Sequence, residues 1–430
     1  MKHLPNPMRS FAKPQRGKLI AIVSATSAIA VVLAGCSSSK KSGAAASTSA
    51  AASTSAATGS TPAAPSVAAS SAATGGGASL PASIAVTAIQ DLTGAVGAVG
   101  IATQNGMNLA VKEINASGML GSTQLSINYK DTATTSAQAV SLMSAAAASD
   151  SVAIFGPVSS QESVAMAPIA QTSKVPTIFT QSGADGVITA GNFNFRVTAP
   201  QAFFQPKLIS YLSAHNIKSV DLLYDTDVPT TKGLAEQTLP PLFKAANITL
   251  KNSYGIQTTT TDISAYVSKI AGENPDAVGI SDTNPGVSPA IIALRNAGYK
   301  GLIFGGSSFG VASLKAAGAQ AKGVVWTTDF DPQSTFPQTV KFVADYKAAY
   351  SGAAPNNYAA EGFDAAYLLA YGLKDTTGAL SRTTLQAGLT TATMAGFSGA
   401  LGQLTFQGND LREAGYVETY DGAGNVSPAT

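Results

Sequence analysis

From residue 84 onward, short apolar runs alternate with segments whose apolar residues recur at helical spacing. The first run is IAVTAIQ at 84–90, and the predicted helix that follows at 103–115 carries Met107, Val111 and Ile114 on one face. The connections between runs are short. Parallel strands are joined by crossover helices, so this alternation predicts an α/β fold with parallel strands.

A second series of strands and helices begins near residue 203. Its predicted strands are VDLLYD, ITLKNSYG, AVGIS, GLIFGG and GVVWTTD, with a helix between each pair. Two such series predict two sheets. Three helices near 337–350, 358–374 and 381–391 then follow one another without a strand, and LGQLTF and GYVETYD close the chain as strands. This departure indicates that the chain crosses back to cover the first domain.

The first 35 residues have the pattern of a secretory signal, with a basic start and an apolar segment at 19–32 that is too short for a comfortable membrane span. The tripeptide before Cys36, the only cysteine, is Leu-Ala-Gly, which resembles the lipobox of bacterial lipoproteins. That resemblance implies removal of residues 1–35 and lipidation of Cys36, which would anchor the protein to the membrane. The alternative is a plain secreted protein with a buried cysteine.

Residues 36–81 follow as a segment composed almost entirely of Ala, Ser, Thr and Gly. Such a composition buries too little apolar surface to offset the entropy of ordering. We therefore predict a disordered linker between the lipidated cysteine and the folded part.

Composition excludes several functions. Five basic residues precede Cys36 and no acidic one does, so the formal net charge of +2 becomes −3 from Cys36 onward, which argues against nucleic acid as a partner. One cysteine and two histidines leave no thiolate metal site. The sequence lacks G-x-G-x-x-G, G-x-S-x-G and H-E-x-x-H. We expect no cofactor, no metal and no catalytic residues, and therefore no enzyme.

The stretch VAIFGPVSSQES at 152–163 predicts a buried strand, a tight turn and the start of a helix. Serines at the beginning of a helix accept hydrogen bonds from backbone N–H groups as caps. Free N–H groups at the same place bind an acceptor or an anion. The stretch therefore predicts either a capped helix or one wall of a solute site.

The order of motifs from residue 84 to residue 426 resembles that of type I periplasmic binding proteins, specifically the leucine/isoleucine/valine-binding family that serves ABC transporters. The segments that carry the resemblance are DLTG at 91–94, NGMNLAVKEINASGMLG at 105–121, YKDTATTSAQAV at 129–140, GPVSSQESVAMAPIA at 156–170, NFRVTAP at 194–200, LRNAGYKGLIFGG at 294–306, EGFDAAYLL at 361–369 and GQLTF at 402–406.

This resemblance implies two Rossmann-like α/β lobes with parallel sheets, joined by a hinge of three chain crossings, with solute bound between the lobes. The implied crossings lie near 199–201, 326–329 and 413–416. The implied lobe limits are 82–199 plus 329–413 for lobe 1 and 200–328 plus 414–430 for lobe 2.

The resemblance also implies ligand contacts. Ser160 aligns with the family serine that donates a hydrogen bond to the ligand carboxylate, and Gln181, Ser182 and Gly183 align with the segment that holds the amino acid. Four further residues stand where the amino-acid binders carry tyrosines and a glutamate: Thr230, Thr283, Ser307 and Ser308.

The expected glutamate is missing, and a buried ammonium group without an acceptor costs several kcal/mol. Four aspartates are candidates to replace it, although each also fits a turn or a cap: Asp91, Asp225, Asp227 and Asp282.

We expect an extracytoplasmic lipoprotein, anchored to the cell membrane, that captures a small solute and delivers it to the permease of an ABC importer. The solute is predicted to be an amino acid or a related small polar, amide or carboxylate compound. The alternative is a sensor subunit that presents the solute to a membrane receptor. In either case we expect a monomer that closes around its ligand at the hinge.

Overall fold

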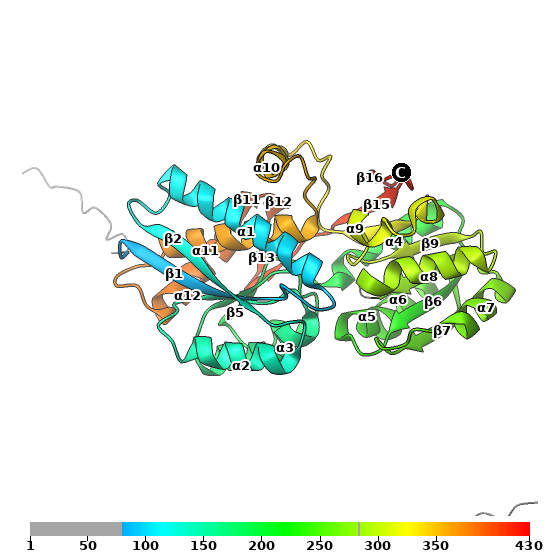
Figure 1. The fold of residues 1–430 in the computed structure, drawn as a ribbon, viewed down its shortest axis with the longest axis horizontal. Helices are drawn as coiled ribbons and strands as arrows, with labels where there is room; N and C mark the ends of the chain where they lie inside the picture. The colour runs from blue at the N-terminus through cyan, green and yellow to red at the C-terminus, as the bar shows by residue number, and fades with distance from the viewer. Residues whose placement is uncertain (1–79, 283) are drawn as a thin grey trace, which may run out of the picture. The chain divides into compact units, whose positions relative to one another are not determined.

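The structure, a computed structural model, describes residues 80–282 and 284–430. The predicted signal peptide, Cys36 and residues 36–79 of the predicted linker lie outside the described residues, as does Thr283. The chain from residue 80 onward forms two seven-stranded sheets that are mostly parallel, with helices on both faces (Figure 1). The predicted α/β class and the two-sheet organisation are confirmed.

The first sheet has the strand order β13-β14-β5-β4-β3-β1-β2. Its strands are β1 (Ser83–Gln90), β2 (Gln124–Asp131), β3 (Ile154–Phe155), β4 (Thr177–Phe179), β5 (Asn194–Arg196), β13 (Phe406–Gln407) and β14 (Asp410–Leu411). All pairs are parallel except the β13–β14 hairpin. The carboxyl ends of parallel strands meet at one edge, so the loops after β1, β3 and β4 lie together there.

Helices cover both faces of the first sheet. One face packs against α1 (Gly97–Ser117), α10 (Pro337–Ala349), α11 (Asn357–Lys374) and α12 (Arg382–Ala395). The other packs against α2 (Ser136–Ala147) and α3 (Ser160–Thr172), which Figure 1 shows on the opposite side from α1 and α11. Strand β1 serves both cores, because Val86 and Ala88 belong to the first cluster and Ile89 belongs to the second.

The second sheet has the strand order β16-β15-β10-β9-β8-β6-β7. Its strands are β6 (Ser219–Asp225), β7 (Thr249–Ile256), β8 (Ala277–Ser281), β9 (Leu302–Gly305), β10 (Val325–Thr328), β15 (Tyr416–Tyr420) and β16 (Val426–Pro428). Strands β6 to β10 pair in parallel, and β15 and β16 add an antiparallel edge. A separate hairpin is formed by β11 (Phe397–Gly399) and β12 (Gly402–Leu404).

The second sheet is covered in the same way. Helices α4 (Gln205–Ala214) and α6 (Leu239–Ala245) pack on one face, and α7 (Ser264–Glu273), α8 (Asn284–Asn296) and α9 (Val311–Leu314) pack on the other. Helix α5 (Pro229–Gly233) continues into α6 through one π-helical turn, Leu234–Thr238. Pro240 and Pro241 lack the N–H groups that α-helical bonding would require just after this turn. Short 3-10 turns lie at Asp185–Val187, Gln201–Phe203 and Gly318–Ala321.

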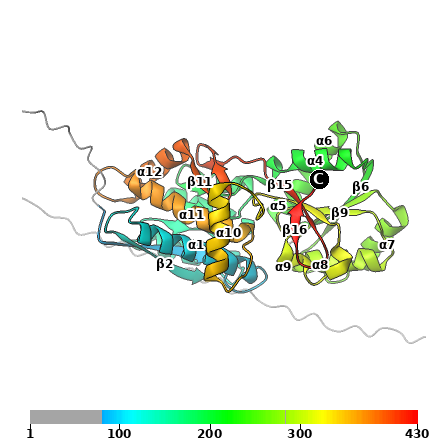
Figure 2. The same ribbon diagram turned by 90° about the horizontal axis from the view of Figure 1, so that it is seen from above.

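The chain passes from one sheet to the other three times, after β5, β10 and β14. Figure 2 shows α10 and α11, which follow β10, beside α1 of the first sheet, and α12 beside α11. We call the first sheet with its helices lobe 1 and the second sheet with its helices lobe 2. The residue limits expected for the lobes stay a prediction, because strand pairing assigns strands to sheets and leaves the loops unassigned.

The start of α1 differs from the sequence prediction. The helix begins at Gly97 and not near residue 103, so residues 97–102, which include Gly97 and Gly100, are also helical. The glycines there serve close packing, since a Cβ at Gly100 would lie 1.9 Å from the carbonyl oxygen of Asp91. Strand β3 is likewise shorter than predicted and covers only Ile154–Phe155.

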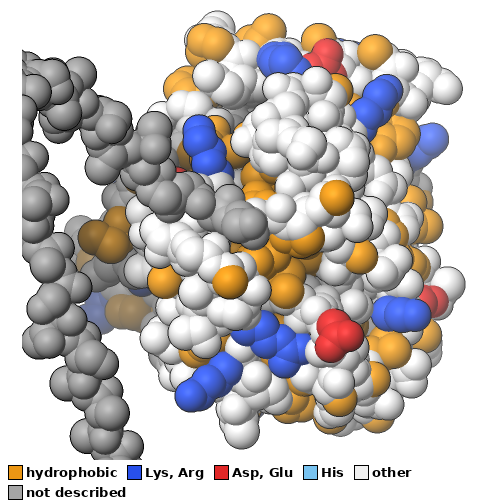
Figure 3. Space-filling view, turned by 90° about the vertical axis from the view of Figure 1, so that its left-hand side faces the viewer, with side chains coloured by type: hydrophobic (Ala, Val, Ile, Leu, Met, Phe, Trp, Pro, Cys, Tyr) orange, Lys and Arg blue, Asp and Glu red, His pale blue; other side chains and the backbone are white. Residues whose placement is uncertain are grey.

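No helix within the described part of the chain is both long and apolar enough to cross a membrane. On the face shown in Figure 3, charged side chains are few and both signs are scattered over a mostly uncharged surface. This pattern agrees with a composition in which only 12% of residues are charged.

Candidate functional site

The turn between β3 and α3 is held from behind by buried side chains. Gln90 donates from Nε2 to the carbonyl oxygen of Gly156, and Ser163 donates from Oγ to the carbonyl oxygen of Pro157 at 3.0 Å. Asp91 Oδ2 accepts from the backbone N–H of Val158 at 3.1 Å and from that of Ser159 at 3.3 Å. These two N–H groups are therefore used within the protein.

The prediction that free N–H groups at this turn bind the solute is therefore wrong for Val158 and Ser159, because Asp91 satisfies them. The capping alternative is wrong as well. Ser159 stands at the N-cap position of α3 without a side-chain cap hydrogen bond, and Ser160 is the first residue of the helix. The Ser160 hydroxyl instead accepts a hydrogen bond from Thr230.

Asp91 forms a buried acid pair with Glu162, and both side chains are at most 1% exposed. Burial, followed by the charge of Asp91, raises the pKa of Glu162 to about 9. Burial also raises the pKa of Asp91, while the hydrogen bond from Glu162 opposes that rise. Glu162 therefore stays protonated at neutral pH and donates a hydrogen bond to Asp91. The Asp91 carboxylate in turn holds the two backbone N–H groups of the turn.

We expect Asp91→Asn to lower the free energy of unfolding by about 1–3 kcal/mol, because an amide cannot accept from both backbone N–H groups and from Glu162 as a carboxylate does. Glu162→Gln keeps a neutral donor toward Asp91 and should cost less than about 1 kcal/mol. Urea unfolding of the two variants measures the difference. Equal losses for both would contradict the assigned roles.

A cavity of about 260 Å³ lies beside this turn and is bordered by residues from both lobes. Its apolar border consists of Ala95, Val96, Val99, Val158, Val228, Leu234 and Tyr358. Its polar border consists of Thr134, Ser159, Ser160, Gln161, Gln181, Gln201, Thr230, Thr231, Thr258, Ser281, Asp282, Ser307 and Ser308, with Gly306 beside them. Among the described residues that line it, hydroxyl and amide groups dominate, and Asp282 is the one ionisable acid.

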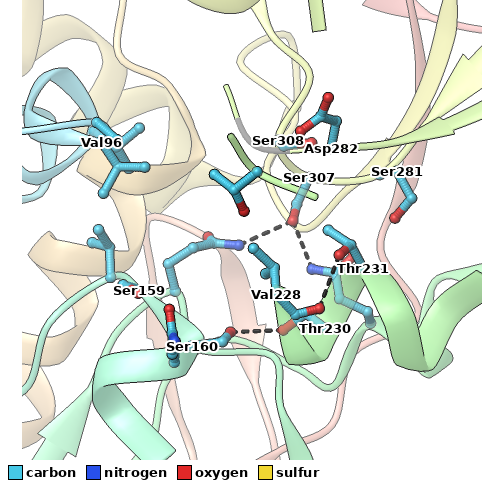
Figure 4. Close-up of a pocket in the computed structure, with 18 of the residues that line it drawn as sticks. Val96, Ser159, Ser160, Val228, Thr230, Thr231, Ser281, Asp282, Ser307 and Ser308 are labelled. Carbon is cyan, nitrogen blue, oxygen red and sulfur yellow. Dashed lines mark hydrogen bonds between the residues drawn. The ribbon is translucent and has the colours of Figure 1, made fainter. Parts of the chain in front are cut away.

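Hydrogen bonds join the two walls of this cavity. Thr230 at the start of α5 donates from Oγ1 to Ser160 Oγ at 2.7 Å, as the dashed line in Figure 4 shows. Ser307, in the loop after β9, has its Oγ 3.0 Å from one end of the Gln181 side-chain amide and 2.6 Å from the Gln201 side-chain nitrogen. The cavity therefore brings the predicted residues of lobe 1 next to those of lobe 2.

Five of the eight residues predicted to contact ligand border the cavity: Ser160, Gln181, Thr230, Ser307 and Ser308. Ser182 and Gly183 do not, and Thr283 lies outside the described residues. Ser182 is buried, and its carbonyl oxygen accepts from the Arg196 guanidinium at 3.0 Å. Gly183 faces the Gln201 side chain, 2.9 Å from where its Cβ would stand.

Arg196 anchors the loop that carries Gln181. It forms a bidentate ion pair with Asp410, at 2.7 and 2.9 Å, and donates to the carbonyl oxygens of Ser182 and Ala184. Its side chain is 1% exposed, so these partners replace the water lost on burial. The pair also ties β5 to β14 across 214 residues of chain.

The four aspartates considered for an ammonium group differ in the structure. Asp91 is used by the serine turn, as described above. Asp225 accepts from Thr258 Oγ1 at 2.6 Å and from the N–H of Asp227, so both belong to a loop network after β6. Asp282 borders the cavity, and one of its carboxylate oxygens lies 2.0 Å from where a Cβ of Gly286 would stand, close against the first turn of α8.

Several border residues were not predicted. Gln201 comes from the first crossing and Tyr358 from the first turn of α11, where its hydroxyl donates to the carbonyl oxygen of Ser307 at 3.0 Å. Neither stands at the carboxyl end of a strand, the signal used to select candidates. Thr231 was adjacent to a predicted residue, so a helical start at Pro229 could have indicated it.

Further acids are buried behind the cavity and near the crossings. Burial raises the pKa of Asp329 to about 6, that of Asp364 to about 7 and that of Glu418 to about 8. Each of these groups binds a proton more tightly in the folded chain than in the unfolded chain. Their contribution to stability is therefore complete at a pH below about 4 and is lost as the pH rises through the folded pKa values.

We expect the free energy of unfolding to fall between pH 5 and pH 8 by at least about 1.4 kcal/mol, the equivalent of one pKa unit. Chemical unfolding at several pH values measures this change. Glu418→Gln removes one titrating group and should make the fall smaller. A stability that rises from pH 5 to pH 8 would contradict the assigned protonation.

A family model described as a periplasmic binding protein matches residues 83–416. The chain belongs to this family, and the resemblance seen in its motifs is confirmed. It is 25% identical over 283 residues to the Leu/Ile/Val-binding protein BraC3 of Rhizobium johnstonii. The aligned residues make up 66% of this chain and 75% of that protein.

Solved structures share the fold. The branched-chain amino acid transporter substrate-binding protein LivJ of Streptococcus pneumoniae, in complex with isoleucine, aligns with a TM-score of 0.73 at 24% identity, over 80% of this chain and 97% of that one. An ABC transporter solute-binding protein of R. palustris in complex with benzoate aligns with a TM-score of 0.72 at 20% identity, over 80% of this chain and 95% of that one.

Proposed function

We propose that the protein is the solute-binding component of an ABC importer and that it captures a small polar solute of amino-acid size between its lobes. The observation that carries this proposal is the cavity bordered by both lobes, where Ser160 and Thr230 meet. The family match and the amino-acid and carboxylate ligands of the similar solved structures support it.

The solute would favour the closed arrangement because it contacts groups of both lobes. A ligand shifts such an equilibrium only by its difference in affinity for the two arrangements. The three crossings after β5, β10 and β14 would act as the hinge. The permease of the importer would then recognise the closed form.

The proposal places the protein outside the cytoplasm, held to the membrane by a lipid on Cys36. The lipobox-like sequence before this cysteine supports that placement. Membrane fractionation of the wild-type protein against Cys36→Ala tests it, since an unanchored wild-type protein would remove this part of the proposal. We propose no enzymatic step, because the polar groups at the cavity lack a nucleophile–base pair among the described residues.

Ser160→Ala should weaken binding of the solute by about 1–3 kcal/mol if the hydroxyl pairs with a charged group of the ligand. The solute is first found by thermal-shift screening of amino acids, aliphatic and aromatic carboxylates, amides and ureas, and its affinity is then measured by titration calorimetry. Thr258→Ser, which keeps a hydroxyl at the cavity border, is the control. Unchanged affinity in Ser160→Ala would remove this residue from the site.

Saturating solute should also make the protein more compact. Small-angle scattering with and without the solute measures the radius of gyration, which we expect to decrease as the lobes close. An identical scattering curve under saturating solute, with binding confirmed by calorimetry, would contradict closure at the hinge.

A further inference from the structure

Behind the cavity lies a second pair of buried acids, Asp329 after β10 and Glu361 on α11. Both side chains are 0% exposed and are hydrogen-bonded to each other. Asp329 Oδ2 also accepts from Thr198 Oγ1 at 2.7 Å, which joins the first and second crossings. The ion pairs formed among residues 80–282 and 284–430 involve other carboxylates, so no Lys or Arg of these residues forms an ion pair with Asp329 or Glu361. Two such carboxyls share a proton.

The proton resides on Glu361. Burial, followed by the charge of Asp329, raises the pKa of Glu361 well above its usual value. The hydrogen bonds from Thr198 and Glu361 keep Asp329 the stronger acid of the two. The other charges that act on this pair are also acidic, Asp364 on α11 and Glu413 before β15, and Lys207 acts on Glu413.

The Gln181 side chain connects this acid pair to the cavity. One end of its amide lies 3.0 Å from Ser307 Oγ. The other end contacts both carboxyl oxygens of Glu361, Oε1 and, at 2.6 Å, Oε2, and lies 3.2 Å from Asn357 Nδ2. The amide fits in two directions, and its neighbours decide between them. The protonated Glu361 carboxyl donates a hydrogen bond to Asp329. The remaining lone pairs of the Glu361 oxygens therefore require donors. Asn357 supplies one at 3.3 Å, and the Gln181 nitrogen supplies the other.

We propose that the Asp329–Glu361 pair turns the Gln181 nitrogen inward, so that Ser307 donates to Gln181 and presents a lone pair to the cavity as an acceptor for an N–H group of the solute. Gln201 donates to Ser307 Oγ at 2.6 Å, and Ser307 donates to the Gln181 oxygen. The Gln181 nitrogen then donates to Glu361, which donates to Asp329, so all hydrogen bonds of this chain run in one direction. Figure 4 shows Ser307 at the border of the cavity with both of its hydrogen-bond lines.

This direction defines the class of solute. A hydroxyl that already donates to Gln181 and accepts from Gln201 has one lone pair left, and it can only accept. The solute therefore carries an ammonium or amide N–H group at the Ser307 end. Acting through Gln181 and Ser307, the buried acid pair takes the place of the glutamate that the family resemblance implies for amino-acid binders. The inference rests on the proposed capture of a small polar solute.

The test compares L-leucine, 4-methylpentanamide and 4-methylpentanoate, which share a carbon skeleton and differ in their N–H groups. Calorimetry should show that wild-type protein binds leucine or the amide about tenfold more tightly than the acid, the value of roughly one hydrogen bond. Ser307→Ala and Gln181→Met should remove that preference, because neither variant keeps the Ser307 acceptor in its proposed direction. Tighter binding of the acid by the wild-type protein, or a preference that Ser307→Ala leaves intact, would overturn the proposal.

Infrared spectroscopy at pH 7 examines the acid pair without any ligand. The difference between the wild-type protein and Glu361→Gln should contain a carboxylic-acid C=O band, and the variant should keep the preference for N–H ligands because glutamine also donates to Asp329. Glu418→Gln is the matched control, since it replaces another buried acid and should leave the ligand preference unchanged. A spectrum in which Glu361 is ionised would refute the proton assigned to this acid pair. If none of the three compounds binds, the proposed function fails for solutes of this size and the proposed N–H ligand class fails with it, and the infrared band then decides only the protonation of Glu361.

Discussion

Buried ionisable groups hold the loops around the cavity, and hydrogen bonds, an ion pair and bound protons offset the free energy that their burial costs. Asp91 holds the serine turn, Arg196 holds the loop that carries Gln181, and Asp329 joins two crossings through Thr198. A buried charge is tolerated only when it is paired, hydrogen-bonded or neutralised by a proton. The buried ionisable groups therefore fix the positions of the polar groups that border the cavity.

Lobe 1 and its crossings stabilise their buried ionisable groups in two different ways. Arg196 and Asp410 form an ion pair, whereas Asp91 with Glu162 and Asp329 with Glu361 are acid pairs that each keep a proton. An ion pair leaves its hydrogen bonds with one possible direction. Where two carboxyls share a proton, the hydrogen bonds of the groups connected to them can run in either direction. At the cavity this direction decides whether Ser307 donates to the solute or accepts from it.

Much of the fold was predictable because strand and helix periods differ and the connections are short. The strands predicted at 84–90, 220–225 and 277–281 are observed as Ser83–Gln90, Ser219–Asp225 and Ala277–Ser281. The helix start at Gly97 was missed, because a glycine-rich stretch predicts a loop unless a neighbouring backbone requires close approach. In the site, Ser160 and Thr230 were predicted from a family resemblance, whereas Gln201 and Tyr358 stand outside the strand ends where candidates were sought.

The sequence by itself determined the α/β class, the two series of strands and the residue types available for binding, since these depend on local periodicity and composition. The resemblance in its motifs further predicted that the ammonium-binding glutamate of the amino-acid binders is missing. Only the tertiary structure decided which hydroxyls meet across the cavity and which N–H groups Asp91 occupies. It also placed Glu361 beside Asp329, 32 positions apart in the chain. Burial and contact between distant residues set protonation and hydrogen-bond direction, and neither property can be read from residues taken singly.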